Sequence, residues 1–202
     1  MKYAIICGSH RKNSQSLNVG EFLKWKIEQN PEDEAYVLDL ATSNIPFWDE
    51  SIWSGSPKWD KIWGGHSDRL SKSEAIIIVT PEWGGMVTPI LKNFFLLCSK
   101  GELAHKPGLI VSISSGRGGT YPVSELRMSS YKNNYICYIP DHIIIRYVSE
   151  FFKEFDQSKS DEEDYIRQRI DYSLSVLKEY TKALNLVRES QVIDLKSYSY
   201  GM

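Results

Sequence analysis

The chain has 202 residues, of which 42% are hydrophobic and 25% charged, and its formal net charge at pH 7 is -2. These values are typical of one well-cored globular domain and exclude disordered, collagen-like and repeat architectures. The nearly balanced charge, without a basic stripe, argues against nucleic acid or a membrane surface as the partner, so we expect a small molecule.

The sequence shows no secretory leader and no apolar stretch long enough to cross a bilayer, which favours a cytoplasmic protein. Its cysteines, Cys7, Cys98 and Cys137, are widely spaced in apolar segments, so we expect three buried thiols. Its Cys and His residues lack the spacing of a metal site, and no Ser, His and Asp spacing supports a covalent nucleophile. We therefore expect no metal and assign no catalytic side chain.

A short apolar segment, residues 3–7 (YAIIC), predicts the first strand, because it is bounded by glycine and is too short for a buried helix. Apolar residues then recur with helical spacing over residues 17–27, which predicts a helix. Residues 8–16 (GSHRKNSQS) therefore lie where a strand ends and a helix begins. The unpaired amides and the macrodipole of a helix N-terminus favour an anion at such a position.

The side chains of segment 8–16 strengthen this interpretation. Ser9, Ser14 and Ser16 offer hydroxyl donors, and Arg11 offers a guanidinium suited to phosphate oxygens. Serine and asparagine are also ordinary helix caps, however, and Arg11 can equally be a solvated surface charge. The segment alone leaves both interpretations open.

The remaining predicted elements alternate between strand and helix. The predicted strands cover residues 34–40, 75–80, 109–113 and, as a fifth strand broken near Asp141, 136–139 and 142–148. The predicted helices cover residues 57–71, 89–98, 120–131 and a long last helix that opens with a capping box at Ser160 and Glu163. This order predicts a mostly parallel sheet with helices on both faces.

Three polar, glycine-bearing loops follow the first, third and fourth predicted strands: residues 8–16, 81–88 and 114–119. In the strand order 2-1-3-4-5 these strands are neighbours, so their exit loops converge at the carboxyl edge of the sheet, where such folds bind ligands. The sequence therefore predicts a ligand site at this edge.

Two segments carry a resemblance to a known family. GSHRKNSQS is similar to the GSxRxxSxS phosphate loop of the NAD(P)H-dependent FMN reductase family, and SEAIIIVTPEW followed by LKN is similar to its ADxIIxxTPEYN and LKN segments. That family includes quinone, azo-dye and chromate reductases. The resemblance implies an α/β fold, a flavodoxin-like three-layer sandwich with a five-stranded parallel sheet of order 2-1-3-4-5. We expect this domain to cover residues 1–187, followed by a tail, 188–202, of unknown role.

The resemblance also implies a set of FMN-binding residues. The phosphate would contact Ser9, Arg11, Ser14, Gln15 and Ser16. The isoalloxazine would lie along Pro81, Glu82, Trp83, Gly84 and Gly85, and its other side would be closed by Ser115, Gly116 and Gly119. Glycines suit such positions because a flat ring approaches backbone closely only where no Cβ intrudes.

Three positions depart from the family pattern. Trp83 replaces the usual tyrosine and keeps an aromatic wall without the phenol hydroxyl. Gly84 stands where the family has asparagine, and Met86 where serine is common. The third loop, SSGRGG, is also one residue shorter than the family's SxGxxGG.

The function implied by the resemblance is that of a flavoprotein oxidoreductase. Hydride would pass from NADPH or NADH to FMN and then to a small-molecule electron acceptor such as a quinone, azo compound, metal oxyanion or free flavin. Family members are commonly homodimers or homotetramers, which we expect here too. The alternative is a flavin-binding redox sensor or electron carrier without a small-molecule substrate of its own.

Two features of the sequence each allow two interpretations. The Trp-rich segment 48–63 either completes the core or forms a subunit interface that also caps the flavin. Arg117 either reaches a dinucleotide phosphate or faces solvent.

Overall fold

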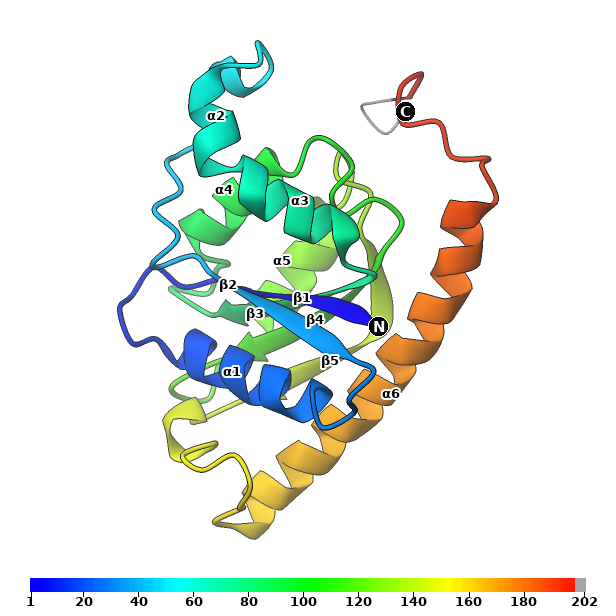
Figure 1. The fold of residues 1–202 in the computed structure, drawn as a ribbon. Helices are drawn as coiled ribbons and strands as arrows, with labels where there is room; N and C mark the ends of the chain where they lie inside the picture. The colour runs from blue at the N-terminus through cyan, green and yellow to red at the C-terminus, as the bar shows by residue number, and fades with distance from the viewer. Residues whose placement is uncertain (199–202) are drawn as a thin grey trace.

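A five-stranded parallel sheet forms the centre of the protein in the computed structural model, which describes residues 1–198 (Figure 1). The strand order is β2-β1-β3-β4-β5, which confirms the predicted flavodoxin-like class. The strands are β1 (Lys2–Cys7), β2 (Glu34–Asp39), β3 (Ala75–Pro81), β4 (Pro107–Ile113) and β5 (Cys137–Ile145). β1, β3 and β4 are adjacent and parallel, so their exit loops share one edge of the sheet.

Helices cover both faces of the sheet (Figure 1). One hydrophobic core joins α1 and α6 to the sheet, and a second core on the other face joins α2, α3, α4 and α5 to it. The helices are α1 (Gln15–Ile27), α2 (Pro57–Ile62), α3 (Gly64–Lys72), α4 (Pro89–Leu97), α5 (Tyr121–Ser129) and α6 (Asp161–Glu189), with short 3-10 turns η1 (Glu50–Ile52) and η2 (Val148–Glu150).

The apolar run of β3 reflects burial on both faces. Every residue of this strand is buried. Ile77 packs in the α1 and α6 core, whereas Ile76 and Ile78 pack in the opposite core. Because successive side chains of a strand point to opposite faces, a central strand covered on both sides needs consecutive apolar residues.

α1 lies very close to β1, and Gly20 is the residue that permits it. A Cβ on Gly20 would lie 2.4 Å from Sγ of Cys7. Burial raises the pKa of the Cys7 thiol far above its ordinary range, and the pKa of Cys98 is raised for the same reason. Both thiols are buried as predicted, but Cys137 is only half-buried, because it begins the edge strand β5.

The predicted helix over residues 57–71 is instead two helices, α2 and α3, separated at Trp63. The chain turns there, and Gly64 and Gly65 follow, which are the weakest helix formers apart from proline. Trp59 and Trp63 are buried in the core, as the first interpretation of the Trp-rich segment required. Trp53, by contrast, is 68% exposed, so the segment both completes the core and leaves an aromatic side chain on the surface.

β5 was predicted as a broken strand, but it is one strand with an irregularity. Its pairing with β4 shifts between Gly108 and Ile110, near the predicted break at Asp141. The carbonyls of residues 139–141 all accept hydrogen bonds from Arg127 Nη2 of α5, at 2.7, 3.1 and 3.1 Å. The guanidinium satisfies backbone groups that the irregular pairing leaves open.

α6 (Asp161–Glu189) has Ser160 as its N-cap, whose Oγ accepts a hydrogen bond from the Glu163 amide at 3.1 Å. The other half of the predicted capping box does not form, because the Glu163 carboxylate accepts from the amides of Phe152 and Lys159 instead, at 3.2 and 3.1 Å. The helix continues through Glu189, two residues into the segment expected to be a tail. The chain then folds back without regular structure, and Leu195 Cδ1 would be only 2.9 Å from a Cβ on Gly101. Residues 199–202 of the expected tail lie outside the described residues.

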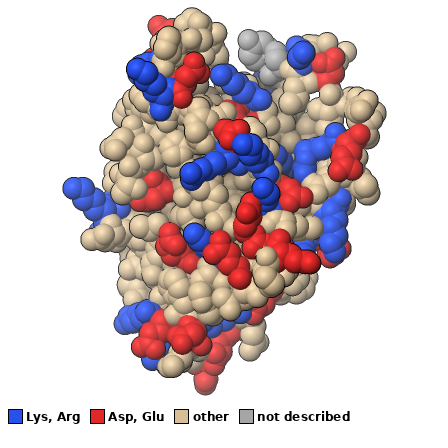
Figure 2. All heavy atoms as spheres, in the orientation of Figure 1, with Lys and Arg blue, Asp and Glu red and all other residues tan. Residues whose placement is uncertain are grey.

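Basic and acidic side chains are interspersed over the face formed by α1, α3 and α6 (Figure 2). Neither sign forms one continuous block over the whole of this face. Within residues 1–198, no helix has both the length and the apolar character needed to cross a bilayer.

Candidate functional site

The three predicted loops meet around a cavity of about 220 Å³ at the carboxyl edge of the sheet. Every predicted residue of the first loop lines this cavity, together with Pro81, Glu82, Trp83 and Ser115. The lining is formed by Ser9, Arg11, Asn13, Ser14, Gln15, Ser16, Pro81, Glu82, Trp83, Ile113, Ser114, Ser115 and Val148. The loops meet because β1, β3 and β4 are neighbours in the sheet, as expected from the sequence.

The first loop is held in place from both ends. The Gly8 amide donates to the Val79 carbonyl at 2.8 Å, which ties the end of β1 to β3. Ser14 caps α1, because its Oγ accepts a hydrogen bond from the Leu17 amide at 3.1 Å. The amides of the first helical residues, Gln15 and Ser16, belong to the group of helix N–H donors that have no intrahelical acceptor. They therefore suit an anion in the cavity.

Two polar side-chain atoms of this loop are buried without a hydrogen-bond partner among the described residues: Gln15 Oε1 and Ser16 Oγ. Leaving such atoms unpaired costs about 1–3 kcal/mol each. Ser16 Oγ offers a hydroxyl donor to an anion, and Gln15 Oε1 accepts from a ligand hydroxyl or N–H. Both atoms belong to residues that line the cavity, so a polar ligand would satisfy them.

The second loop forms a tight turn that places Trp83 against the cavity. The Trp83 and Met86 backbones exchange two hydrogen bonds of 3.0 Å, and the two residues between them have left-handed φ values, +57° at Gly84 and +75° at Gly85. These are the conformations of a type I′ turn, which favours Gly or Asn at both central positions. Gly84 therefore keeps the backbone geometry that asparagine also permits.

Substitution of Gly84 tests the role of this turn. We expect Gly84→Val to lower the free energy of unfolding by about 1–2 kcal/mol, the cost of a left-handed residue with a Cβ. Gly84→Asn should change the free energy of unfolding by less than about 0.5 kcal/mol, since asparagine tolerates this conformation. The nearest atom to a Cβ there is Met86 Cε at 3.6 Å, so backbone strain rather than crowding is measured. Equal urea midpoints for both variants would contradict this assignment.

Glu82 connects the second loop to the third. Its Oε2 accepts hydrogen bonds from the amides of Gly119, at 2.7 Å, and Tyr121, at 3.3 Å. Glu82 was expected to lie along a flavin ring, and it does line the cavity, but its carboxylate is engaged in holding the third loop and the start of α5. Its structural role was not visible in the sequence, because the contact joins residues far apart in the chain.

The predicted glycines shape the loops and do not line the cavity. Gly84 and Gly85 form the turn beside Trp83, and Gly119 has a φ of +111°. Gly116 faces open space, since no heavy atom lies within 4 Å of the position of its Cβ. The amide of Gly116 donates to Ser114 Oγ at 3.2 Å, which folds the third loop back on itself.

Sequence reasoning missed four lining residues: Asn13, Ile113, Ser114 and Val148. Asn13 lies inside the first predicted loop, and its left-handed φ of +51° is a conformation that asparagine adopts readily. Val148 follows β5, and its amide donates to the Ser114 carbonyl at 3.0 Å. The exit of the fifth strand thus contributes to the cavity as well, as its position beside β4 allows.

Arg117 lies on the rim of the third loop and is exposed. Its Nε donates to the Tyr147 hydroxyl at 2.9 Å, and its carbonyl accepts from Arg146 Nε at 2.8 Å. These contacts anchor the side chain beside the site and leave both interpretations of Arg117 open.

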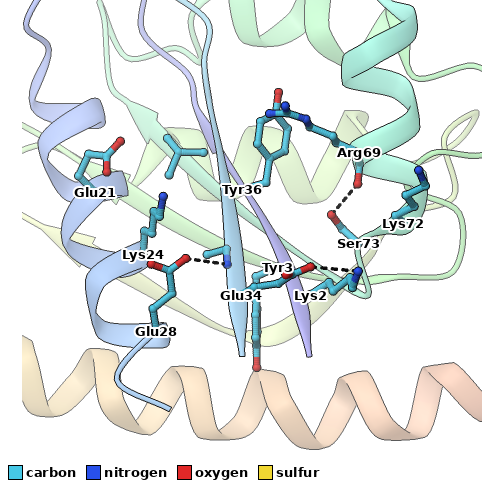
Figure 3. A pocket seen from close by; sticks show the side chains of 12 residues that line it. Lys2, Tyr3, Glu21, Lys24, Glu28, Glu34, Tyr36, Arg69, Lys72 and Ser73 are labelled. Atoms are coloured by element: carbon cyan, nitrogen blue, oxygen red, sulfur yellow. Dashed lines mark hydrogen bonds and ion pairs between the residues drawn. The ribbon is translucent and has the colours of Figure 1, made fainter. Parts of the chain in front are cut away.

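A larger hollow of about 550 Å³ lies along the free edge of β2, between α1 and α3 (Figure 3). Two of its acidic residues have partners within the hollow: Glu34 forms an ion pair with Lys2 at 3.1 Å, and Glu28 Oε1 accepts from the Ala35 amide at 3.3 Å. The hollow extends toward the amino ends of β1 and β2, whereas open α/β sheets bind ligands at the carboxyl ends. We therefore take the smaller cavity as the candidate functional site.

Comparison with known proteins identifies relatives of the chain. The family model described as NADPH-dependent FMN reductase matches residues 1–148. A quinone reductase of Pseudomonas putida is 30% identical over 122 residues, 58% of this chain and 62% of the relative. An FMN-dependent NADH:quinone oxidoreductase of Bacillus velezensis is 28% identical over 103 residues, 41% of this chain and 47% of the relative. These matches cover less than two thirds of either relative's length.

Solved structures share the fold. The flavoenzyme NAD(P)H:(acceptor) oxidoreductase FerB of Paracoccus denitrificans has a TM-score of 0.63 at 16% identity, covering 91% of this chain and 97% of that one. A flavodoxin from Archaea has a TM-score of 0.55 at 12% identity, covering 89% and 99% of the two chains. At these identities the likeness shows the fold alone.

Proposed function

Because the chain belongs to the NADPH-dependent FMN reductase family, we propose that it is an FMN-dependent oxidoreductase that transfers electrons from NADPH or NADH to a small acceptor. We propose a quinone as the acceptor class, since two relatives are named for quinone reduction. The observation that carries the proposal is the cavity where three loops meet, with Gln15 Oε1 and Ser16 Oγ buried and unpaired among the described residues.

The residues that line the cavity fit FMN by their chemistry. The serine hydroxyls of the first loop, the Gln15 and Ser16 amides and the Arg11 guanidinium would hold the phosphate. The segment from Pro81 to Gly85 would border the isoalloxazine, and Ser115, Gly116 and Gly119 would lie on its other side. When bound, FMN supplies two-electron chemistry, accepting a hydride from NAD(P)H and passing it on.

Protein groups would then act by binding and orientation. The Trp83 ring provides an apolar wall, and its position is fixed by the glycine turn behind it. Glu82, on the second loop, accepts hydrogen bonds from the Gly119 and Tyr121 amides, and these fix the position of the third loop relative to the second. A site whose loops are fixed before the ligand binds loses less entropy on binding.

The experiment that tests this function starts with the visible spectrum of the purified protein, before and after addition of FMN. Oxidation of NADH and of NADPH is then followed with a quinone as acceptor. We expect a yellow protein that oxidises NAD(P)H when a quinone is present. If both substrates use one face of the flavin, double-reciprocal plots of the initial rate should give parallel lines. A protein that takes up no FMN refutes the proposal, and a yellow protein without turnover supports the sensor or electron carrier instead.

Substitution of Arg11 tests the phosphate contact. We expect Arg11→Ala to weaken FMN binding by about 1.5–3 kcal/mol, roughly 10- to 150-fold in Kd, because it removes a charge-assisted hydrogen bond. Lys12→Ala is the matched control, since Lys12 is an exposed cation of the same loop that does not line the cavity. Fluorescence titration with FMN measures both. Equal losses of FMN affinity in the two variants would show that Arg11 acts only as a general surface charge.

A further inference from the structure

His10 and Trp83 meet beside the cavity. Their ring centroids are 4.6 Å apart and their planes are inclined at 78°, an edge-to-face contact. His10 lies between Ser9 and Arg11, both of which line the cavity, and its own side chain is exposed. Trp83 lines the cavity from the second loop. The contact therefore holds an imidazole next to the proposed ring site while leaving it open to water.

Reduction of a quinone requires a proton as well as a hydride. The hydride brings one hydrogen and an electron pair to one quinone oxygen, and the other oxygen becomes an anion until a proton reaches it. Both oxygens carry an O–H bond in the hydroquinone product. A residue beside the acceptor that can donate a proton near neutral pH therefore accelerates this step.

The other charged groups of the three loops do not suit this task. The carboxylate of Glu82 is an acceptor for the amides of Gly119 and Tyr121. Arg11, in the same loop as His10, is proposed to hold the phosphate, and Arg117, on the third loop, donates to the Tyr147 hydroxyl at 2.9 Å. Lys12, like His10, is exposed and does not line the cavity, but no ring contact within residues 1–198 holds Lys12 against Trp83 as one holds His10. Imidazole is the side chain whose charge changes between roughly pH 5 and 8.

We propose that His10 is the catalytic acid for the acceptor, an inference that rests on the proposed function. The N–H bond of the His10 imidazolium breaks as an O–H bond forms on the anionic quinone oxygen, and the neutral imidazole regains its proton from water. Trp83 is the positioning residue, because its ring sets where the imidazole lies. His10 acts in the half of the reaction that consumes the acceptor and has no part in oxidation of NAD(P)H.

The test compares a quinone with ferricyanide, which takes up electrons without a proton. In His10→Gln we expect kcat/KM for the quinone to fall about 10²-fold, a typical contribution of a general acid, while the rate with ferricyanide stays within twofold. Stopped-flow reduction by NAD(P)H should also stay within twofold. Lys12→Gln, which removes a cation from the same loop, should leave both acceptors unaffected.

Two measurements keep the proposal falsifiable if a variant binds FMN poorly. The pH profile of kcat/KM for the quinone should differ between the wild type and His10→Gln, whereas the two ferricyanide profiles should coincide. In proton NMR of the FMN-free protein, the His10 ring signal, identified by its absence in His10→Gln, should shift in Trp83→Leu as the ring current is lost.

Quinone pH profiles that coincide in the wild type and His10→Gln, or equal losses with quinone and ferricyanide in His10→Gln, would overturn the assignment of His10. An unshifted ring signal in Trp83→Leu would overturn the role of Trp83. A wild type that binds no FMN or oxidises no NAD(P)H would instead refute the proposed function itself.

Discussion

Arg167→Met is expected to lower the free energy of unfolding of the cofactor-free protein by about 3–5 kcal/mol, the usual cost of removing one partner of a buried ion pair. Arg167 Nη2 lies 2.6 Å from Oε1 of Glu163, whose side chain is 1% exposed. Methionine replaces the aliphatic stem of the side chain but leaves the Glu163 carboxylate buried without its cation. Urea unfolding measures the difference.

Arg167 also organises the segment between β5 and α6. Its Nη1 donates to the Phe155 carbonyl at 2.6 Å, and its Nη2 donates to the carbonyls of Glu154 and Gln157, both at 2.8 Å. Its guanidinium lies 4.8 Å from the centre of the Phe22 ring of α1. Loss of the guanidinium therefore removes hydrogen bonds from a loop as well as an ion pair, which places the expected effect toward the upper end of the range.

Two control variants separate burial from charge. Lys182→Met breaks an ion pair of the same helix whose side chains are 54% and 69% exposed, and we expect a loss below about 1 kcal/mol. Glu163→Gln added to Arg167→Met should recover part of the stability, because no uncompensated charge then remains buried. A loss below 1 kcal/mol in Arg167→Met itself would contradict the prediction.

As the pH falls, the free energies of unfolding of the wild type and Arg167→Met should become more similar. Burial alone would raise the pKa of Glu163, but Arg167 and the amides of Lys159 and Phe152 hold that pKa below its ordinary value of 4.5. This stabilisation is complete above pH 4.5 and is lost as pH falls through the lowered pKa. In the variant Arg167 no longer offsets the effect of burial, so the Glu163 carboxyl protonates more readily. The free-energy penalty of burying it therefore shrinks already as the pH falls toward 4.5.

The fold could be predicted because the periodicity of the elements and their alternation along the chain are visible in the sequence, while the family resemblance implied the strand order. The continuous apolar run of β3 indicates burial on both faces, and alternation of strands with helices restricts the sheet to a few orders. The break between α2 and α3 was missed because Trp59 and Trp63 keep helical spacing across it. Apolar spacing reports which residues face the core, and it does not report a change in helix direction between them.

The location of the site could also be predicted, since adjacent parallel strands bring their exit loops together. The contacts between the loops of the site could not be predicted from the sequence. The hydrogen bond from Gly119 to Glu82 joins loops separated by α4 and β4, and the His10 contact with Trp83 joins loops separated by six elements, from α1 to β3. Such pairs have no fixed spacing along the chain, so only the folded structure identifies them.

Gly119→Ala is expected to lower the free energy of unfolding by about 2–3 kcal/mol, since strain at an unfavourable φ and a steric overlap act together. The φ of Gly119 is +111°, and a Cβ there would lie 2.7 Å from Ile144 Cγ2. Because the Gly119 amide also donates to Glu82 at 2.7 Å, any shift of this residue loosens the tie between the second and third loops. We therefore expect FMN affinity to fall at least tenfold as well.

Gly116→Ala is the matched control in the same loop. No heavy atom lies within 4 Å of a Cβ at Gly116, so the free energy of unfolding should change by less than about 0.5 kcal/mol. If Gly116 borders the flavin as proposed, the added methyl group should still weaken FMN binding, because it occupies the space into which the ring would fit. Urea unfolding and FMN titration of both variants thus distinguish a glycine that the fold requires from one that the cofactor requires. Equal stability of the two variants would contradict the role of Gly119, and unchanged FMN affinity in Gly116→Ala would remove Gly116 from the site.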